Sequence, residues 1–164
     1  MLDVFFDPVV AALSRLEDNR YPDLAEAVSP REVLGWPRVD EKIRELCRRF
    51  RTSTTAQDYR AVGTHCVGVI EAVSKVVYDP KRHLRDGEVE PPVDKSKQRL
   101  DRYIEGALRG EPNEELRGLA KRAVALAHQV KHRSTPTRRE AGIDADAVIL
   151  MANILRRLDD EGTS

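Results

Sequence analysis

The sequence predicts an all-α protein built as a single-domain helical bundle of about six to seven helices. Apolar residues recur at helical spacing from one end of the chain to the other. No Asn-Gly hairpin turn and no sustained alternation of polar and apolar residues indicates a strand. A length of 164 residues suits one domain with one hydrophobic core.

Residues 1–54 are expected to form an N-terminal helical segment packed on the core. A first helix is predicted within "FDPVVAALSRLED", where Asp7 can cap the helix and Pro8 suits its first turn. A short second helix is predicted over 21–28, and a third from about Pro37. The third helix has one apolar stripe, made by Val39, Ile43, Leu46 and Phe50.

Residues 55–158 are expected to form the main bundle, which opens with the most regular core helix of the chain. That helix is predicted to end at Asp79-Pro80. Residues 79–93 contain three prolines and a glycine, and are expected to form an irregular excursion loop. The buried stripe of the helix is predicted to be Val62, Cys66, Val69, Val73 and Val76.

Three further helices are predicted after this loop. The first lies in "DKSKQRLDRYIEGALRGEP", ended by Gly110 and Pro112, and the second starts near Asn113. The second helix has a predicted stripe of Leu116, Leu119, Ala123, Leu126 and Val130.

The last helix is apolar over more than half of its circumference, which places it in the centre of the core or in a dimer interface. Residues 159–164 form a polar tail that should fray. One face of the helix is predicted to contain Ile143, Ala147, Val148, Met151, Ile154, Leu155 and Leu158, widened by Ala145, Ile149 and Ala152.

The composition excludes several classes of protein. The 28 basic and 28 acidic residues cancel, which argues against a protein that coats nucleic acid through bulk charge. No apolar run approaches the roughly 20 residues of a membrane span, and acids stand where a signal peptide needs cations. Cys47 and Cys66 have no zinc-site spacing and are expected to be small core residues. A cytoplasmic protein without a cofactor is the resulting expectation.

The distribution of charge is more informative than its sum, because residues 116–139 contain no acid. If this segment is one continuous helix, four of its cationic or titratable side chains lie within about 60° of one another around the helix axis. They form a basic face opposite the buried stripe. Such a face can bind phosphates, and its histidines can transfer protons near neutral pH. The four are Arg117, Lys121, His128 and His132. The other cations of this window are Arg122, Lys131, Arg133, Arg138 and Arg139.

Purely structural explanations compete with this interpretation. Cations near the end of a helix complement its dipole, and Thr137 with Glu140 matches a capping box. A metal held by His128 and His132 would need a third ligand, and the cationic surroundings oppose it, so no metal is expected. His65 is expected to be a packed helix residue. For His83 we expect a solvated loop residue, with a phosphate contact as the alternative.

Residues 68–78 together with 116–155 resemble the C-terminal domain of abortive-infection proteins, a member of the HEPN group of helical bundles. Gly68, Glu71 and Lys75 fit an early helix of that family. The resemblance implies an HEPN-like core and an RNA-directed role in bacterial phage defence or a toxin–antitoxin system. It also implies a homodimer, here expected through the last helix, and a partner that is RNA, an antitoxin or a larger defence protein.

Active members of this family are metal-independent endoribonucleases with an arginine, four to six residues, and then a histidine. Arg122 and His128 are separated by five residues. The resemblance therefore implies His128 as general acid or base, with His132 second and Arg122 on the phosphate. The remaining cations of the acid-free window are expected to bind RNA phosphates.

Two features of this motif keep a non-catalytic alternative open. The residue after Arg122 is Ala123, where the family usually has a polar residue. On an unbroken helix, Arg122 and His128 also point about 120° apart. The alternative is a catalytically degenerate dimeric module that binds nucleic acid or another protein.

Overall fold

The computed structural model describes residues 35–162, apart from 131 and 133. This part of the chain is all-helical, which confirms the predicted fold class. The helices expected before residue 29 lie outside the described residues. The elements are α2 (Pro37–Thr52), α3 (Ala56–Val77), α4 (Pro80–His83), α5 (Ser96–Ala107), the 3-10 turn η1 (Glu111–Asn113), α6 (Glu114–Val130) and α7 (Arg138–Gly162).

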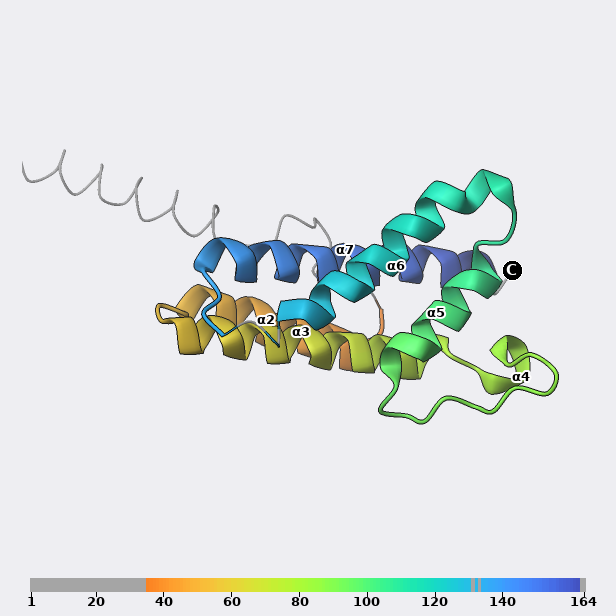
Figure 1. Ribbon diagram of the computed structural model, residues 1–164, viewed down its shortest axis with the longest axis horizontal. Helices are drawn as coiled ribbons and strands as arrows, with labels where there is room; N and C mark the ends of the chain where they lie inside the picture. Colours follow the sequence, from red (N-terminus) through yellow and green to blue (C-terminus); the bar gives the residue numbers. More distant parts are fainter. Residues whose placement is uncertain (1–34, 131, 133, 163–164) are drawn as a thin grey trace, which may run out of the picture.

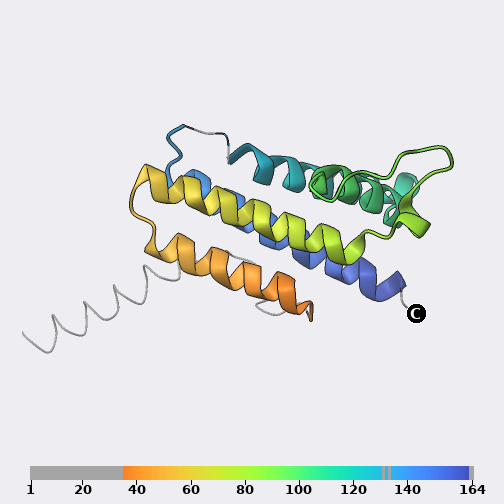
Figure 2. The same cartoon turned by 90° about the horizontal axis from the view of Figure 1, so that it is seen from below.

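The helices pack around a central pair, α3 and α7, which lie along one another (Figure 1). Figure 2 shows α2 on one side of this pair and α5 with α6 on the other. α6 runs diagonally across α7 in Figure 1. The α2–α3 and α6–α7 connections meet at one end of the bundle, and α4 lies at the opposite end, near the C-terminus.

α2 and α3 begin where the local sequence predicts. Pro37 occupies the first position of α2, where its missing N–H costs no helical hydrogen bond. Thr55 caps α3 by accepting a hydrogen bond from the Asp58 N–H, and the Asp58 carboxylate accepts one from the Thr55 N–H. The predicted stripe of α2 is fully confirmed, since Val39, Ile43, Leu46 and Phe50 are all buried.

The stripe of α3 is confirmed except at its end. Val76 is 43% exposed, and Val77 is buried in its place. A strict alternation of three and four residues averages 3.5 per turn, whereas a straight helix has 3.6, so the buried line shifts to the next position. The excursion also differs from an irregular loop, because it begins with the four-residue helix α4.

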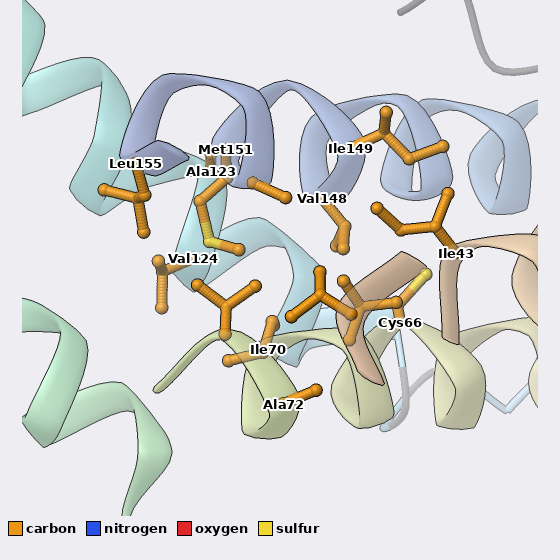
Figure 3. Packing of buried hydrophobic residues seen from close by; sticks show 14 of the residues in the cluster. Ile43, Cys66, Ile70, Ala72, Ala123, Val124, Val148, Ile149, Met151 and Leu155 are labelled. Atoms are coloured by element: carbon orange, nitrogen blue, oxygen red, sulfur yellow. The ribbon is translucent and has the colours of Figure 1, made fainter. Parts of the chain in front are cut away.

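The core runs through the whole bundle, with buried residues from α2, α3, α5, α6 and α7. Figure 3 shows Met151 of α7, Val124 of α6 and Ile70 of α3 gathered in one layer. The predicted stripe of α6 is wrong at Leu119, which is 47% exposed, whereas Ala120 is fully buried. α6 crosses α7 at an angle, and the short side chains of alanine allow the two backbones to approach.

α7 buries a wide apolar arc, as the sequence predicts, but the arc is centred differently. Ile143 is 47% exposed and Leu150 is 43% exposed. The side chain of Asp144 is buried instead. The buried apolar residues of α7 are Ala141, Ala145, Val148, Ile149, Met151, Ala152 and Leu155.

Arginines hold the excursion between α4 and α5 against the bundle. Arg99 Nε donates to the Pro91 carbonyl at 2.9 Å, and its Nη2 pairs with Glu90 at 2.8 Å. Arg102 pairs with Glu88. The segment is therefore fixed by polar contacts to α5 more than by burial of apolar side chains.

Candidate nucleic-acid interface

The predicted basic face of α6 is partly used to join α6 to α5. Arg117 Nη1 donates to the carbonyl of Leu108 at 2.6 Å and to that of Gly110 at 3.2 Å. These carbonyls follow the end of α5, where the helix leaves C=O groups without an internal partner. Arg117 therefore caps the neighbouring helix.

Lys121 makes a second link to α5. Its Nζ lies 2.6 Å from Glu105 Oε1, and this hydrogen bond is the main cause that lowers the pKa of Glu105. Arg85 pairs with the other oxygen of the same carboxylate at 3.1 Å. Lys121 thus shares the carboxylate of Glu105 with Arg85.

The histidines of this region do not share one helical face. α6 ends at Val130, and His132 follows in a turn in which its backbone N–H donates to the Gln129 carbonyl at 3.0 Å. His128 is half-buried on the helix, and Arg122 is exposed. Because α6 is continuous over these positions, Arg122 points about 120° away from His128. Lys131 and Arg133 lie outside the described residues.

Asp101 of α5 lies within electrostatic range of His128. Burial raises the pKa of Asp101, while Lys121 and Lys97 oppose that rise. His128 also interacts with this carboxyl group. The α5–α6 boundary thus contains two titratable groups that influence each other electrostatically.

Another concentration of cations lies at the end of the bundle where the α2–α3 and α6–α7 connections meet. Arg60 at the start of α3 donates to the Ser134 carbonyl, and Arg138 of α7 donates to the Ser53 carbonyl at 3.1 Å. These contacts bring segments 48–60 and 134–140 together. We call their six arginines the arginine end: Arg48, Arg49, Arg51, Arg60, Arg138 and Arg139.

The acids of these two segments, Asp58 and Glu140, are already engaged in helix caps. Hydrogen bonds from Thr54 and Thr55 lower the pKa of Asp58, and Arg49 pairs with its other oxygen at 3.0 Å. Glu140 accepts from the N–H of Thr137 at 2.8 Å, which confirms the predicted capping box. The arginine end therefore has a net positive charge.

Two of these arginines keep their charge while they are held in place. Arg60 and Arg138 donate to backbone carbonyls, which are neutral acceptors. A guanidinium group has five N–H donors, so each can bind a phosphate in addition. Arg139 follows Arg138 in α7 and is exposed.

The acid-free window contains only two of the six arginines of this surface, Arg138 and Arg139. The other four lie in segment 48–60, outside the predicted site. The local run "RRFR" at 48–51 was the available signal. Its proximity to the second segment depends on contacts that span 74 and 85 residues.

The other two histidines lie in grooves between helices. His65 is half-buried between α2 and α3, and burial lowers its pKa. The expectation of a solvated His83 is wrong, because its ring packs between Tyr78 and Tyr103. Within the described part of the chain, His, Cys, Asp and Glu side chains form no group of three or more that could hold a metal ion. None of the described helices has the length and apolar character needed to cross a bilayer.

No protein-family model, curated protein or solved structure matches this chain.

Proposed function

We propose that this chain is an RNA-directed, HEPN-like helical module of bacterial phage defence or a toxin–antitoxin system, and that it binds the RNA backbone through the arginine end. The supporting observation is that contacts of Arg60 and Arg138 join two segments that together contain six arginines, while the two acids of these segments are engaged in caps. Cytoplasmic RNA is the expected ligand.

The mode of binding follows from the side chains available. Guanidinium groups pair with phosphate oxygens and release the counterions of the RNA, so affinity should decrease with salt. Aromatic residues make up 5% of the chain, too few for a platform on which bases stack. Recognition should therefore depend on the backbone and shape of the RNA more than on its sequence.

Fluorescence anisotropy with a labelled RNA hairpin, measured over a series of salt concentrations, tests this proposal. Arg48 and Arg139 are exposed, and neither is needed to cap a helix. The double substitution Arg48→Ala, Arg139→Ala should weaken binding several-fold and reduce the salt slope by about one per lost contact. Lys81→Ala, an exposed cation on α4 at the other end of the bundle, is the matched control. Salt-independent binding, or an equal loss in the control, would contradict the proposal.

A metal-independent endoribonuclease is the second candidate, favoured by the electrostatic interaction between Asp101 and His128. His128 would take the proton of a ribose 2′-hydroxyl or give one to the leaving oxygen, with Asp101 as the second titratable group. Arg122 would stabilise the charge on phosphorus. Since Arg122 and His128 point apart on one helix, the arginine would come from a second copy of the chain.

Cleavage can be tested with purified protein and structured RNA in excess EDTA. His128→Ala should abolish cleavage and retain binding, whereas His65→Ala, between α2 and α3, should keep both. Intact RNA in the presence of the unaltered chain would exclude the endoribonuclease and leave the binding module in place.

The second copy is expected to bind the outer face of α7. Ile143, Ala147, Leu150 and Ile154 follow steps of four, three and four residues, which is the spacing of a helix–helix seam. Ile143 and Leu150 are exposed on this face. A two-fold axis would pair the face with itself. An antitoxin or a larger defence protein would compete for the same face.

Light scattering should give the mass of a dimer. The double substitution Ile143→Glu, Leu150→Glu should give a monomer. Val93→Glu, which changes an exposed apolar residue of the excursion, should leave the dimer intact. A monomeric mass for the unaltered chain would contradict this part of the proposal.

A further inference from the structure

A cleft lies between α4 and α5, at the end of the bundle opposite the arginine end. It consists of two adjoining hollows of about 390 and 620 Å³. Volumes of a few hundred Å³ are typical of small-molecule sites. Both hollows are lined by the same four residues: Arg82, His83, Gly106 and Arg109.

His83 is held in one orientation and one tautomer. Its Nδ1 accepts a hydrogen bond from the Asp79 N–H at 2.9 Å, so the proton of the neutral ring is on Nε2. The ring centre lies 5.3 Å from that of Tyr103, edge to face, and 5.8 Å from that of Tyr78. Burial, followed by the charge of Arg82, lowers the pKa of His83.

Gly106 lets this ring reach the cleft. A Cβ atom at position 106 would lie 3.4 Å from His83 Cδ2, the ring atom next to Nε2. The donor edge of His83 therefore lies against the glycine that lines both hollows.

The arginines of the cleft fall into two kinds. Arg102 pairs with Glu88, and Arg85 shares the carboxylate of Glu105 with Lys121. Arg82 and Arg109 form no ion pair with the described residues. Asp159 lines the first hollow and Asp86 lines the second. The wall that the two hollows share presents two guanidinium groups outside ion pairs of the described residues, together with an imidazole N–H.

We propose that this cleft binds the terminal phosphate of a small phosphomonoester, with Arg82, Arg109 and His83 as its donors. Guanidinium groups and a neutral imidazole N–H all donate to phosphate oxygens. The apolar wall formed by Val77, Tyr103 and Leu158 would contact the organic part of the molecule. The site is separate from the proposed RNA interface, since 21 residues of α7 between Arg138 and Asp159 span about 32 Å.

Isothermal titration calorimetry with adenosine 5′-monophosphate, ribose 5-phosphate and adenosine tests this site. Both phosphates should bind to the unaltered chain at least about tenfold more tightly than adenosine. Arg82→Ala and Arg109→Ala should each weaken phosphate binding by about tenfold. Both side chains are exposed, so the variants should fold, which circular dichroism would check. Arg44→Ala, an exposed arginine of α2, is the matched control.

His83→Asn separates the donor role from the structural role. The asparagine oxygen can accept the Asp79 N–H in place of Nδ1, while the ring N–H is lost, so phosphate affinity should fall and folding should persist. In nuclear magnetic resonance spectra, inorganic phosphate should shift the ring signals of His83 and leave those of His65 unchanged.

Three results would overturn the phosphate site: equal affinity for adenosine and its monophosphate, the same loss in Arg44→Ala, or no binding of either phosphate at about 10 mM. The RNA-binding proposal would survive each of them. Conversely, Arg48→Ala, Arg139→Ala should leave binding of the monophosphate unchanged.

Discussion

The guanidinium group of Arg138 lies 4.8 Å from the centre of the Phe50 ring and donates a hydrogen bond to the Ser53 carbonyl. This one side chain joins the start of α7 to the end of α2. Arg139, next in the chain, is exposed. Two adjacent arginines of the arginine end therefore have different roles, although both are positively charged.

Arg138→Ala should lower the free energy of unfolding by about 1–2 kcal/mol, because a cation–π contact and a hydrogen bond are lost together. Arg139→Ala should change it by less than about 0.5 kcal/mol. Urea denaturation followed by circular dichroism measures both. Equal stability of the two variants would show that the Phe50 contact contributes nothing. Both variants should weaken RNA binding if the arginine end is the interface.

Arg117→Ala should destabilise the fold without weakening RNA binding. Its guanidinium group caps carbonyls at the end of α5, and a charged hydrogen bond of this kind contributes about 1.5–3 kcal/mol. Thermal unfolding should show the loss, and anisotropy at a temperature where the variant remains folded should show unchanged affinity. A stable variant with reduced affinity would instead support the phosphate role predicted for Arg117 from the sequence.

Two helical glycines should respond in opposite ways to alanine. A Cβ at Gly118 would meet no atom within 4 Å, so Gly118→Ala should raise the free energy of unfolding by about 0.5–1 kcal/mol through helix propensity. A Cβ at Gly142 would lie 3.2 Å from Phe50 Cζ, in a ring held by Arg138. Gly142→Ala should therefore be no more stable than the unaltered chain. Denaturation midpoints of the two variants measure these changes in stability. An equal increase in stability for both variants would contradict the close packing of Phe50 against Gly142.

Asp58 and Asp101 should give opposite dependences of stability on pH. The pKa of Asp58 is lowered on folding, so its contribution is present above the ordinary aspartate value of about 3.9 and is lost as the pH falls through the lower folded value. The pKa of Asp101 is raised, so its ionisation destabilises the fold progressively as the pH rises from about 3.9 through the higher folded value.

Asp58→Asn should therefore reduce stability at neutral pH and have less effect in acid. Asp101→Asn should increase stability at neutral pH and change little in acid. Urea unfolding at several pH values between about 2.5 and 7 would show both trends. A neutral-pH loss of stability in Asp101→Asn would mean that its charge forms a stabilising contact with Lys121.

Helix positions could be predicted from the sequence because caps and apolar spacing are local. Thr55 with Asp58, and Thr137 with Glu140, mark the starts of α3 and α7 without reference to other elements. The orientation of a helix in the bundle is less local. Apolar spacing predicts that Leu119 is buried, because Leu119 is the larger apolar residue. Ala120 is buried instead, because small side chains fit best where α6 crosses α7.

For the candidate site, the sequence predicts an excess of cationic residues and not their arrangement in space. The acid-free window correctly indicated an excess of cations, since a segment without acids cannot neutralise its own charge. Two of these cations, Arg117 and Lys121, form structural contacts with the Leu108 carbonyl and with Glu105. Both partners belong to α5 or directly follow it, so the sequence of α6 alone does not reveal these contacts. The arginines of segment 48–60 join the surface through contacts with residues more than 70 positions away, and local spacing has no information about those contacts.

The excursion after α4 has a consequence for proteolysis. Salt bridges of Arg99 and Arg102 tie this segment to α5, and Val89 at its tip is 86% exposed. Both ion pairs are partly buried, so added salt screens them only weakly. A protease should therefore cut the chain first at this exposed tip between α4 and α5, at low and at high salt alike.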